Sequence, residues 1–244
     1  MRLDLLLTPA DVNAERLRER AVVIFDVLRA TTTMTAALAV GVEEIRVFAD
    51  VESARRAAAE AAQLRPRPLL CGEMQCLPPA GFDLGNSPGA LNESAHRGRT
   101  LFMSTTNGTR AIIAARSAPL VLIGALVNAS AVAGVLSEAG RDVTLLCAGT
   151  NGEPAMEDVI GAGAVAEALG ARGGVTHESD LARMAVWLFR GARGDFRAAL
   201  AEGSGGRNVV LAGLAADIDF AARFDVFDVV GRVKDGPLRV ERYC

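Results

Sequence analysis

The sequence is poor in the residues on which several common kinds of site depend. Among its 244 residues there are two histidines, one tryptophan and one tyrosine, and aromatic residues make up only 5% of the chain. The four cysteines are scattered, and with so few histidines they form no zinc-ligand spacing. This composition argues against a zinc site and a disulfide framework, and it favours reduced, buried thiols in a cytoplasmic protein.

Long apolar runs and an excess of positive charge are also missing. No stretch reaches the roughly 18 apolar residues that a membrane-spanning helix needs. Asp4 interrupts the short apolar run of Met1–Pro9, so we expect a first strand there rather than a signal peptide. The net charge of −3 and the pI near 5.5 argue against a nucleic-acid or membrane surface. They leave room for a small anionic substrate, because one pocket can be positive on an acidic protein.

Aliphatic residues are plentiful and fall into alternating strand-like and helix-like stretches. Half of the residues are apolar, so the core must be mainly aliphatic, as in a parallel sheet buried between helices. Strand and helix alternate over the first two-thirds of the chain. We therefore predict an α/β fold with one or more mostly parallel sheets flanked by helices. No linker marks a domain boundary, so residues 1–244 form one unit, and a second lobe, if present, would divide from the first near Gly140.

Two stretches depart from this alternation. About 25 residues, Glu73–Arg97, show no clear periodicity, a length that usually indicates a functional loop in a compact domain. The last third of the chain is mostly helical, with one helical segment expected over Arg207–Phe224. A closing hairpin is expected around Lys234–Gly236.

The first candidate site lies where a strand passes into a helix, within Val22–Met34. The strand should end near Asp26, and the turn after it carries Arg29 and three hydroxyls, those of Thr31, Thr32 and Thr33. In α/β proteins such turns lie at the carboxyl end of the sheet, where ligands bind. The ordinary interpretation is a threonine cap with a local ion pair, but the chain repeats this kind of turn several times.

Two further turns follow predicted strands. Glu73 comes directly after the strand that ends at Gly72, and Asn86 and Ser87 lie in the aperiodic stretch beyond it. Hydroxyls and an amide fill the next strand-to-helix turn, which consists of Ser104, Thr105, Thr106, Asn107, Gly108 and Thr109. This turn suits a phosphate or a sulfonate, although it lacks the Gly-Lys-Ser/Thr ending of a Walker loop. For both turns, plain helix capping is the competing interpretation.

The fourth turn leads into a helix whose first residues include Glu157 and Asp158. These carboxylates either stabilise the helix dipole or bind a hard cation such as Mg²⁺, which prefers oxygen ligands. Asn208, Asp217 and Asp225 could contribute to a rim, but we interpret them as solvated or capping residues. If all the strands are parallel, the four turns should meet at one edge of the sheet. Carboxylates, hydroxyls and an arginine at that edge suit Mg²⁺-assisted chemistry on an oxyanion.

These motifs, in the same order, resemble the 2-phosphosulfolactate phosphatase family over residues 2–228. They are Asp26-Val-Leu-Arg-Ala-Thr-Thr-Thr33, Gly72-Glu73, Gly81-Phe-Asp-Leu-Gly-Asn-Ser-Pro88, Ser104-Thr-Thr-Asn-Gly-Thr109, Cys147-Ala-Gly149 and Glu157-Asp158. The resemblance implies Mg²⁺-dependent hydrolysis of 2-phospho-3-sulfolactate to 3-sulfolactate and phosphate, a step of coenzyme M biosynthesis in methanogens. It also implies a site in a cleft between two α/β parts. The chain departs from the family pattern at Met74–Cys76, where a basic, glycine-rich stretch is usual, and this bears on the sulfonate end of the substrate.

On this basis, specific roles are expected for the residues of the four turns. Asp26, Glu73, Glu157 and Asp158 are candidate metal ligands, and Asp26, Glu73 and Arg29 are candidate catalytic residues. The hydroxyls and amides of the turns, including Asn86 and Ser87, would bind the substrate. The predicted partners are a small anionic phosphoester and, in a homo-oligomer, further copies of the chain.

Three alternatives remain open from the sequence. The same scaffold would also suit another small phosphorylated hydroxy acid, or a protein that binds anionic metabolites without catalysis. An aspartyl-phosphate at Asp26 is a mechanistic variant, but Leu28 stands where the second carboxylate of an Asp-x-Asp pair would be.

Overall fold

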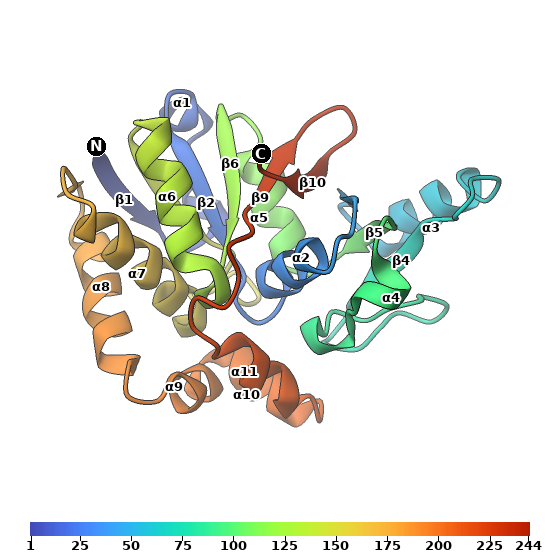
Figure 1. Cartoon of the computed structure of the whole chain (residues 1–244). Coiled ribbons are helices and arrows are strands. Elements are labelled where there is room, and N and C mark those ends of the chain that lie inside the picture. Colours follow the sequence, from blue (N-terminus) through green and yellow to red (C-terminus); the bar gives the residue numbers. More distant parts are fainter.

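A ten-stranded sheet forms the centre of the computed structural model, which describes residues 1–244 (Figure 1). Its strands are β1 (Arg2–Leu6), β2 (Ala21–Phe25), β3 (Glu44–Val47), β4 (Leu69–Gly72), β5 (Thr100–Ser104), β6 (Leu120–Gly124), β7 (Val143–Cys147), β8 (Thr176–His177), β9 (Gly231–Lys234) and β10 (Arg239–Arg242). They lie in the order β4-β5-β3-β10-β9-β6-β2-β7-β1-β8.

The sheet consists of two parallel blocks joined by an antiparallel hairpin. The first block is β6-β2-β7-β1-β8 and the second is β4-β5-β3. The hairpin β9–β10 lies between them and pairs antiparallel with both. The mostly parallel α/β fold is therefore confirmed, and so is the closing hairpin, although it occupies the middle of the sheet.

The strands do not all run in one direction, so the condition under which the four turns were expected to meet at one edge is not met. Three successive antiparallel pairings separate the two blocks. The strands of one block therefore run in the opposite direction to the strands of the other block. Sheet twist, roughly 20–25° per strand, accumulates over these steps and rotates one block relative to the other. Contacts described below show that the carboxyl ends of β2 and β4 still meet.

Helices cover the sheet and extend beyond it. They are α1 (Ala14–Leu17), α2 (Ala30–Ala39), α3 (Val51–Glu60), α4 (Glu93–His96), α5 (Gly108–Ala115), α6 (Ala129–Ala139), α7 (Met156–Ala171), α8 (Asp180–Ala192), α9 (Phe196–Glu202), α10 (Ser204–Leu211) and α11 (Ala215–Ala221). In Figure 1, α9, α10 and α11 lie together below the sheet, and α3 and α4 lie with β4 and β5 on the right. None of the helices combines the length and apolar composition needed to cross a bilayer.

The single helical segment expected over Arg207–Phe224 is wrong in its continuity. The chain forms α10 and α11 with a break at Gly213, whose φ of 76° is left-handed and ends the first helix. The break changes the direction of the chain and allows α11 to bring Asp217 into the interior, where it is 5% exposed.

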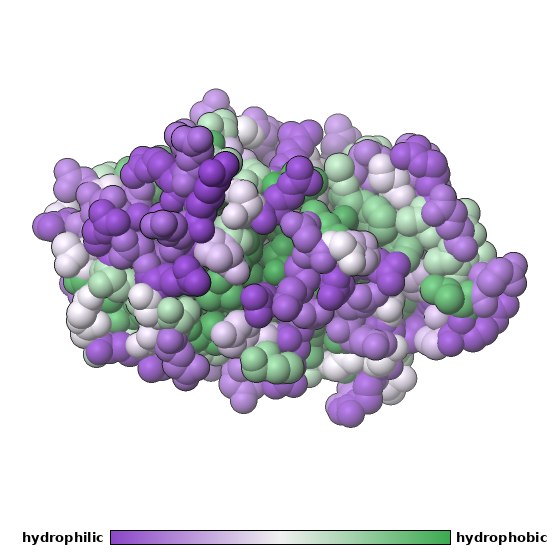
Figure 2. All heavy atoms as spheres, turned by 90° about the horizontal axis from the view of Figure 1, so that it is seen from above, coloured by the Kyte–Doolittle hydropathy of each residue, from purple (hydrophilic) through white to green (hydrophobic).

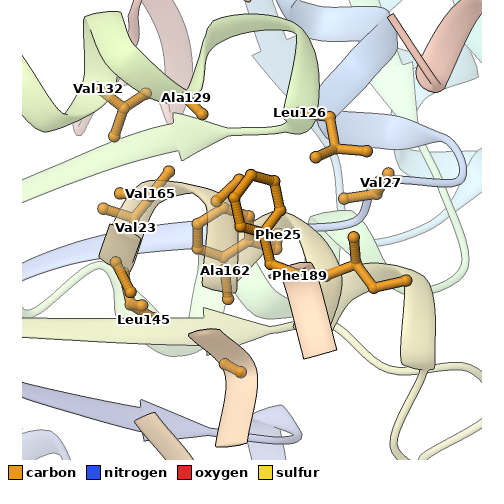
Figure 3. Close-up of a cluster of buried hydrophobic side chains, with 14 of the residues drawn as sticks. Val23, Phe25, Val27, Leu126, Ala129, Val132, Leu145, Ala162, Val165 and Phe189 are labelled. Atoms are coloured by element: carbon orange, nitrogen blue, oxygen red, sulfur yellow. The ribbon is translucent and has the colours of Figure 1, made fainter. Parts of the chain in front are cut away.

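Alternating residues of β2 supply both faces of the core. Val23 and Phe25 belong to a cluster with α6, α7 and α8, in which Ala162 and Phe189 take part (Figure 3). Val22 and Ile24 point to the opposite face and belong to a second cluster with α2, α5 and the strands of the second block. Because both faces of β2 are buried, its end is held rigidly at the edge of the sheet.

The chain passes Gly140, the residue near which a lobe boundary was expected, without leaving the first block. Gly140 caps α6, and the next strand, β7, pairs with β2 and β1. A division of the chain into two domains there stays a prediction. Seen from above, the molecule is elongated, and hydrophilic residues cover most of this face, with apolar ones visible near its middle (Figure 2).

All four cysteines are free, as expected. Cys71 and Cys147 are buried, and burial raises the pKa of the Cys71 thiol to about 12. Cys76 is half-buried and Cys244 is exposed, so the expectation of buried thiols holds for two of the four.

Candidate active site

A small polar cavity lies where the two blocks of the sheet approach each other. Its volume is about 40 Å³, and its lining consists of Asp26, Leu28, Arg29, Glu73, Cys76, Asn86, Asn107, Thr150, Gly205 and Asn208. A groove of about 610 Å³ shares five of these residues and adds the exposed apolar side chains of Met74, Leu77 and Leu211. The sequence-predicted turns therefore converge, although they come from strands that run in opposite directions.

Asp26 is the carboxylate at the end of β2. Its Oδ1 accepts a hydrogen bond from the Ala30 N–H at 3.0 Å, in the first turn of α2, and its own N–H donates to Thr31 Oγ1 at 3.1 Å. Oδ2 has no hydrogen-bond partner in the protein. The side chain is fixed by the helix start and leaves one oxygen for a ligand.

The three threonine hydroxyls predicted to bind substrate are engaged with the protein itself. Thr31 accepts from the Asp26 N–H, Thr32 donates to the Val27 carbonyl, and Thr33 donates to the Asn86 carbonyl. All three residues are at most 1% exposed, and none lines the cavity. They hold the turn in place.

Glu73 follows β4 and is fixed by two backbone donors. The Thr106 N–H donates to Oε1 at 2.7 Å, and the Cys76 N–H donates to Oε2 at 2.9 Å. Met74 and Leu77 exchange backbone hydrogen bonds around a tight turn, in which Gln75 and Cys76 have positive φ. Glu73 thereby joins the loop after β4 to the loop after β5 at the wall of the cavity.

The Ser104–Thr109 turn contributes its backbone and Asn107 to the site. Thr105 and Thr109 bond each other, because Thr105 Oγ1 accepts from the Thr109 N–H and Thr109 Oγ1 donates to the Thr105 carbonyl. Asn107 lines the cavity, and both Thr106 and Asn107 line the larger groove. Ser104, Thr105 and Thr106 line a further groove beside it. Gly108 packs against Asp26, since a β-carbon at Gly108 would lie 2.8 Å from Asp26 Oδ2.

Arg29 is the only positively charged residue in the cavity lining. Its Nη1 donates to Asp217 Oδ2 at 2.6 Å and to Ser87 Oγ at 3.2 Å, and its Nη2 donates to the Cys76 carbonyl. Asp217, which we interpreted from the sequence as solvated or capping, is instead a buried ion-pair partner. The capping role of Asp225 is confirmed, because it accepts from the N–H and the hydroxyl of Ser130 at the start of α6.

Glu157 is enclosed by the start of α10. Its Oε1 accepts from the Gly205 N–H at 2.8 Å, and β-carbons at Gly203 and Gly205 would each lie 2.0 Å from one of its oxygens. Oε2 is buried without a hydrogen-bond partner. Burial raises the pKa of Glu157, while the Gly205 N–H and Arg207 lower it.

Asp158 joins the ends of two central strands. Its Oδ1 accepts from the Val27 N–H at 2.8 Å and its Oδ2 from the Gly149 N–H at 2.9 Å. Asp158 is 2% exposed and does not line the cavity. Its pKa is raised well above the ordinary value by burial and by the nearby carboxylates of Asp26 and Glu157. With both oxygens engaged, it holds the loops after β2 and β7 together.

The cavity combines crowded carboxylates with helix N-termini. The pKa of Asp26 is raised to about 6, chiefly by burial, and the negative charges of Glu73 and Glu157 contribute. The first turns or caps of α2, α5 and α10 supply lining residues, and helix N-termini favour anions. One arginine does not balance the carboxylates, so an anionic ligand would need a cation to accompany it.

The donor set fits a hard cation in chemistry, although not as a preformed cage. No three of the His, Cys, Asp and Glu side chains lie close enough together to form a complete metal site. However, Asn86 Oδ1 and Glu157 Oε2 are buried oxygens without hydrogen-bond partners, and Asp26 Oδ2 also has none. Mg²⁺ commonly takes one or two protein carboxylates and completes its shell with water and substrate phosphate.

Several lining residues escaped the sequence analysis. Thr150 lies in the turn before α7, of which only Glu157 and Asp158 were given roles, and Gly205 lies in the first turn of α10. Cys76 contacts Arg29 through its carbonyl, which carries no sequence signal. Asn208 was recognised only as a rim candidate, and it does line the cavity while remaining exposed.

Known proteins are similar to this chain over nearly its whole length. A family model described as 2-phosphosulpholactate phosphatase matches residues 6–236. The chain belongs to this family. A relative from Caldanaerobacter subterraneus is 35% identical over 237 residues, covering 95% of both chains, and one from Carboxydothermus hydrogenoformans is 35% identical over 248 residues, covering 99% of this chain and 98% of its own. A third, from Parasynechococcus marenigrum, is 44% identical over 207 residues and 84% of both chains; all three are named probable 2-phosphosulfolactate phosphatases. In this member of the family, Asp26, Glu73 and Arg29 share one cavity.

Proposed function

We propose that this chain is a Mg²⁺-dependent phosphatase that hydrolyses 2-phospho-3-sulfolactate to 3-sulfolactate and phosphate. Membership of the family supports the reaction and the substrate. The observation that carries the proposal is the meeting of Asp26, Glu73 and Arg29 in one cavity beside helix N-termini. The substrate carries a phosphate, a carboxylate and a sulfonate, so its charge matches a site that needs a cation.

In this mechanism Asp26 and Glu73 would hold the ion, and Asn86 Oδ1, a buried oxygen without a hydrogen-bond partner, could add a further ligand. Bound Mg²⁺ would neutralise phosphate charge and lower the pKa of a coordinated water. Glu157 lies close enough to raise the pKa of Asp26 and keeps one oxygen without a partner. Asp158 is a less suitable ligand than expected, because it is 2% exposed and, unlike Glu73, does not line the cavity.

The other residues bind and orient the phosphoryl group. Arg29 would bind the phosphoryl oxygens on which negative charge develops in the transition state, and the positive ends of α2, α5 and α10 beside the cavity would favour that charge. The larger groove, lined by Asn107, Asn208 and Thr150 among others, takes the rest of the substrate. Its lining contains no Lys or Arg, so amides and backbone N–H groups would bind the sulfonate and the carboxylate.

The test is phosphate release from 2-phosphosulfolactate by the purified protein, with Mg²⁺ and with EDTA. Rapid release that EDTA abolishes would support the proposal. Phosphate release only from other phosphorylated hydroxy acids would mean that the substrate is one of those acids. Binding of 2-phosphosulfolactate without any phosphate release would favour a non-catalytic protein. A cytoplasmic location and a homo-oligomeric state stay predictions.

A further inference from the structure

Asp217, the buried partner of Arg29, has no place in the mechanism above. Arg29 Nη1 lies 2.6 Å from Asp217 Oδ2, and the two side chains are 3% and 7% exposed. Ser87 Oγ accepts from Arg29 at 3.2 Å and donates to the same Asp217 oxygen at 2.8 Å. One carboxylate oxygen on α11 thus fixes both a guanidinium and a hydroxyl at the edge of the cavity.

A count of donors shows what this arrangement leaves free. A guanidinium has five N–H donors in a plane, and the contacts to Asp217, Ser87 and the Cys76 carbonyl use three of them. The Nε–H and one Nη2–H remain. Arg29 lines the cavity, and its Nε has no hydrogen-bond partner in the protein and is not completely buried. Two free donors of a fixed guanidinium can bind two oxygens of a phosphate.

The charge of Asp217 makes a purely electrostatic role for it unfavourable. The cavity already contains Asp26 and Glu73, and a further carboxylate next to the one arginine weakens the attraction for an anion. A buried ion pair also gives little net stability compared with apolar residues of the same size. The role left for Asp217 is to fix the orientation of the Arg29 guanidinium, so that its Nε–H and its remaining Nη2–H stay available for an anion.

We propose that Asp217 is a positioning residue that orients Arg29 for the oxyanion of the substrate. The proposal rests on the proposed function, since it assumes that a phosphate occupies the cavity. It assigns a role to α11, which follows the turn at Gly213 and carries Asp217 into the interior. Arg29 then links α2, α11 and the Met74–Leu77 turn around the substrate.

The test compares Asp217→Asn in two backgrounds, the wild type and Arg29→Lys. Asparagine keeps the size and one acceptor oxygen and removes the charge. Asp219→Asn is the matched control, since Asp219 lies on the same helix and pairs with Arg197 at 2.6 Å, but at the surface. We would measure kcat and KM for 2-phosphosulfolactate with Mg²⁺, and the Kd of inorganic phosphate with Mg²⁺ by calorimetry.

In the wild-type background, Asp217→Asn should lower kcat/KM and weaken phosphate binding roughly 10- to 100-fold, as for a lost hydrogen bond between charged groups. In the Arg29→Lys background the same change should cost less than about threefold, because the group that it positions is already gone. The control should leave both quantities within about twofold. If Asp217→Asn does not fold, Ser87→Ala removes the bridging hydroxyl and should show the same dependence on Arg29.

Equal losses in both backgrounds, or no loss in either, would overturn the proposal. If the wild type hydrolyses no phosphoester, the proposed function fails, but the phosphate Kd still tests the coupling of Asp217 to Arg29. A wild type that binds no phosphate would also overturn it, since Arg29 would then have no oxyanion to hold.

Discussion

Gly108 lies so close to Asp26 that no side chain fits between them. A β-carbon at Gly108 would lie 2.8 Å from Asp26 Oδ2 and 2.6 Å from the Ala30 β-carbon. The start of α5 therefore packs directly against the carboxylate at the end of β2. This contact fixes the position of Asp26, which lines the cavity, and allows only glycine at position 108.

Gly108→Ala should displace Asp26 and lower kcat/KM by a factor of ten or more, on the order expected for misplacing a reacting group by an ångström. Overpacking should also cost roughly 1–3 kcal/mol of stability in urea unfolding. Gly170→Ala is the control, because a β-carbon there meets nothing within 4 Å in a helix, and it should be neutral or stabilising. A Gly108→Ala variant with the kcat/KM of the wild type would show that activity does not depend on the exact position of Asp26.

Asp26→Asn should abolish turnover and yet stabilise the metal-free protein. The pKa of Asp26 is raised from 3.8 to about 6, so the folded state holds a proton more tightly than the unfolded state. Stability then falls as pH rises from about 4 to about 6 and stays lower above that range. The variant removes this loss, on the order of 2–3 kcal/mol at pH 8. Urea unfolding in EDTA at pH 8 and pH 4 would check it, and the gain should disappear at pH 4.

Asp158→Asn should affect stability more than metal binding. The side chain accepts from the Val27 and Gly149 N–H groups, and asparagine offers only one oxygen for two donors. The expected cost is about 1–3 kcal/mol in urea unfolding. Asp180→Asn, also in the first turn of a helix but exposed, should change stability by less than about 1 kcal/mol. A large loss of Mg²⁺ affinity in a stable Asp158→Asn protein would contradict this expectation and show that Asp158 is a metal ligand.

Mg²⁺ should raise the melting temperature of the wild type. A ligand that binds only the folded state stabilises it by about 2.7 kcal/mol at 100 times its Kd. The shift should be lost in Asp26→Asn and weakened in Glu73→Gln, because both side chains line the cavity. The same melting-temperature measurement with Ca²⁺ in place of Mg²⁺ would show whether the site distinguishes between the two ions. A melting temperature independent of Mg²⁺ would contradict the proposed metal site.

Much of the fold follows from local patterns. The β2 run of Val22 to Phe25 is buried on both faces, as its continuous apolar sequence predicts, and Asp26 and Glu73 each follow a strand directly. The hairpin before the C-terminus was also expected. Local sequence determines these features because strand length, alternation and turn residues act between near neighbours.

The assignment of roles within the site was less successful. Thr31, Thr32 and Thr33 look like ligands in the sequence, but their hydroxyls bond to the backbone of the protein. A hydroxyl in a turn has the same sequence signal whether it faces a ligand or its own backbone. Asp217 shows the opposite error, because no local pattern reveals that a residue 188 positions from Arg29 is its partner.

The sequence by itself therefore determined the α/β class, the strand-ending carboxylates and the family resemblance, since each depends on residue type and order along the chain. Only the tertiary structure decided that the two parallel blocks run in opposite directions and still bring Asp26 and Glu73 to one cavity. It also decided that Asp158 holds two loops together and that Asp217 holds Arg29. These relationships depend on sheet twist and on packing between residues that are far apart in the sequence. No single segment of the sequence therefore reveals them.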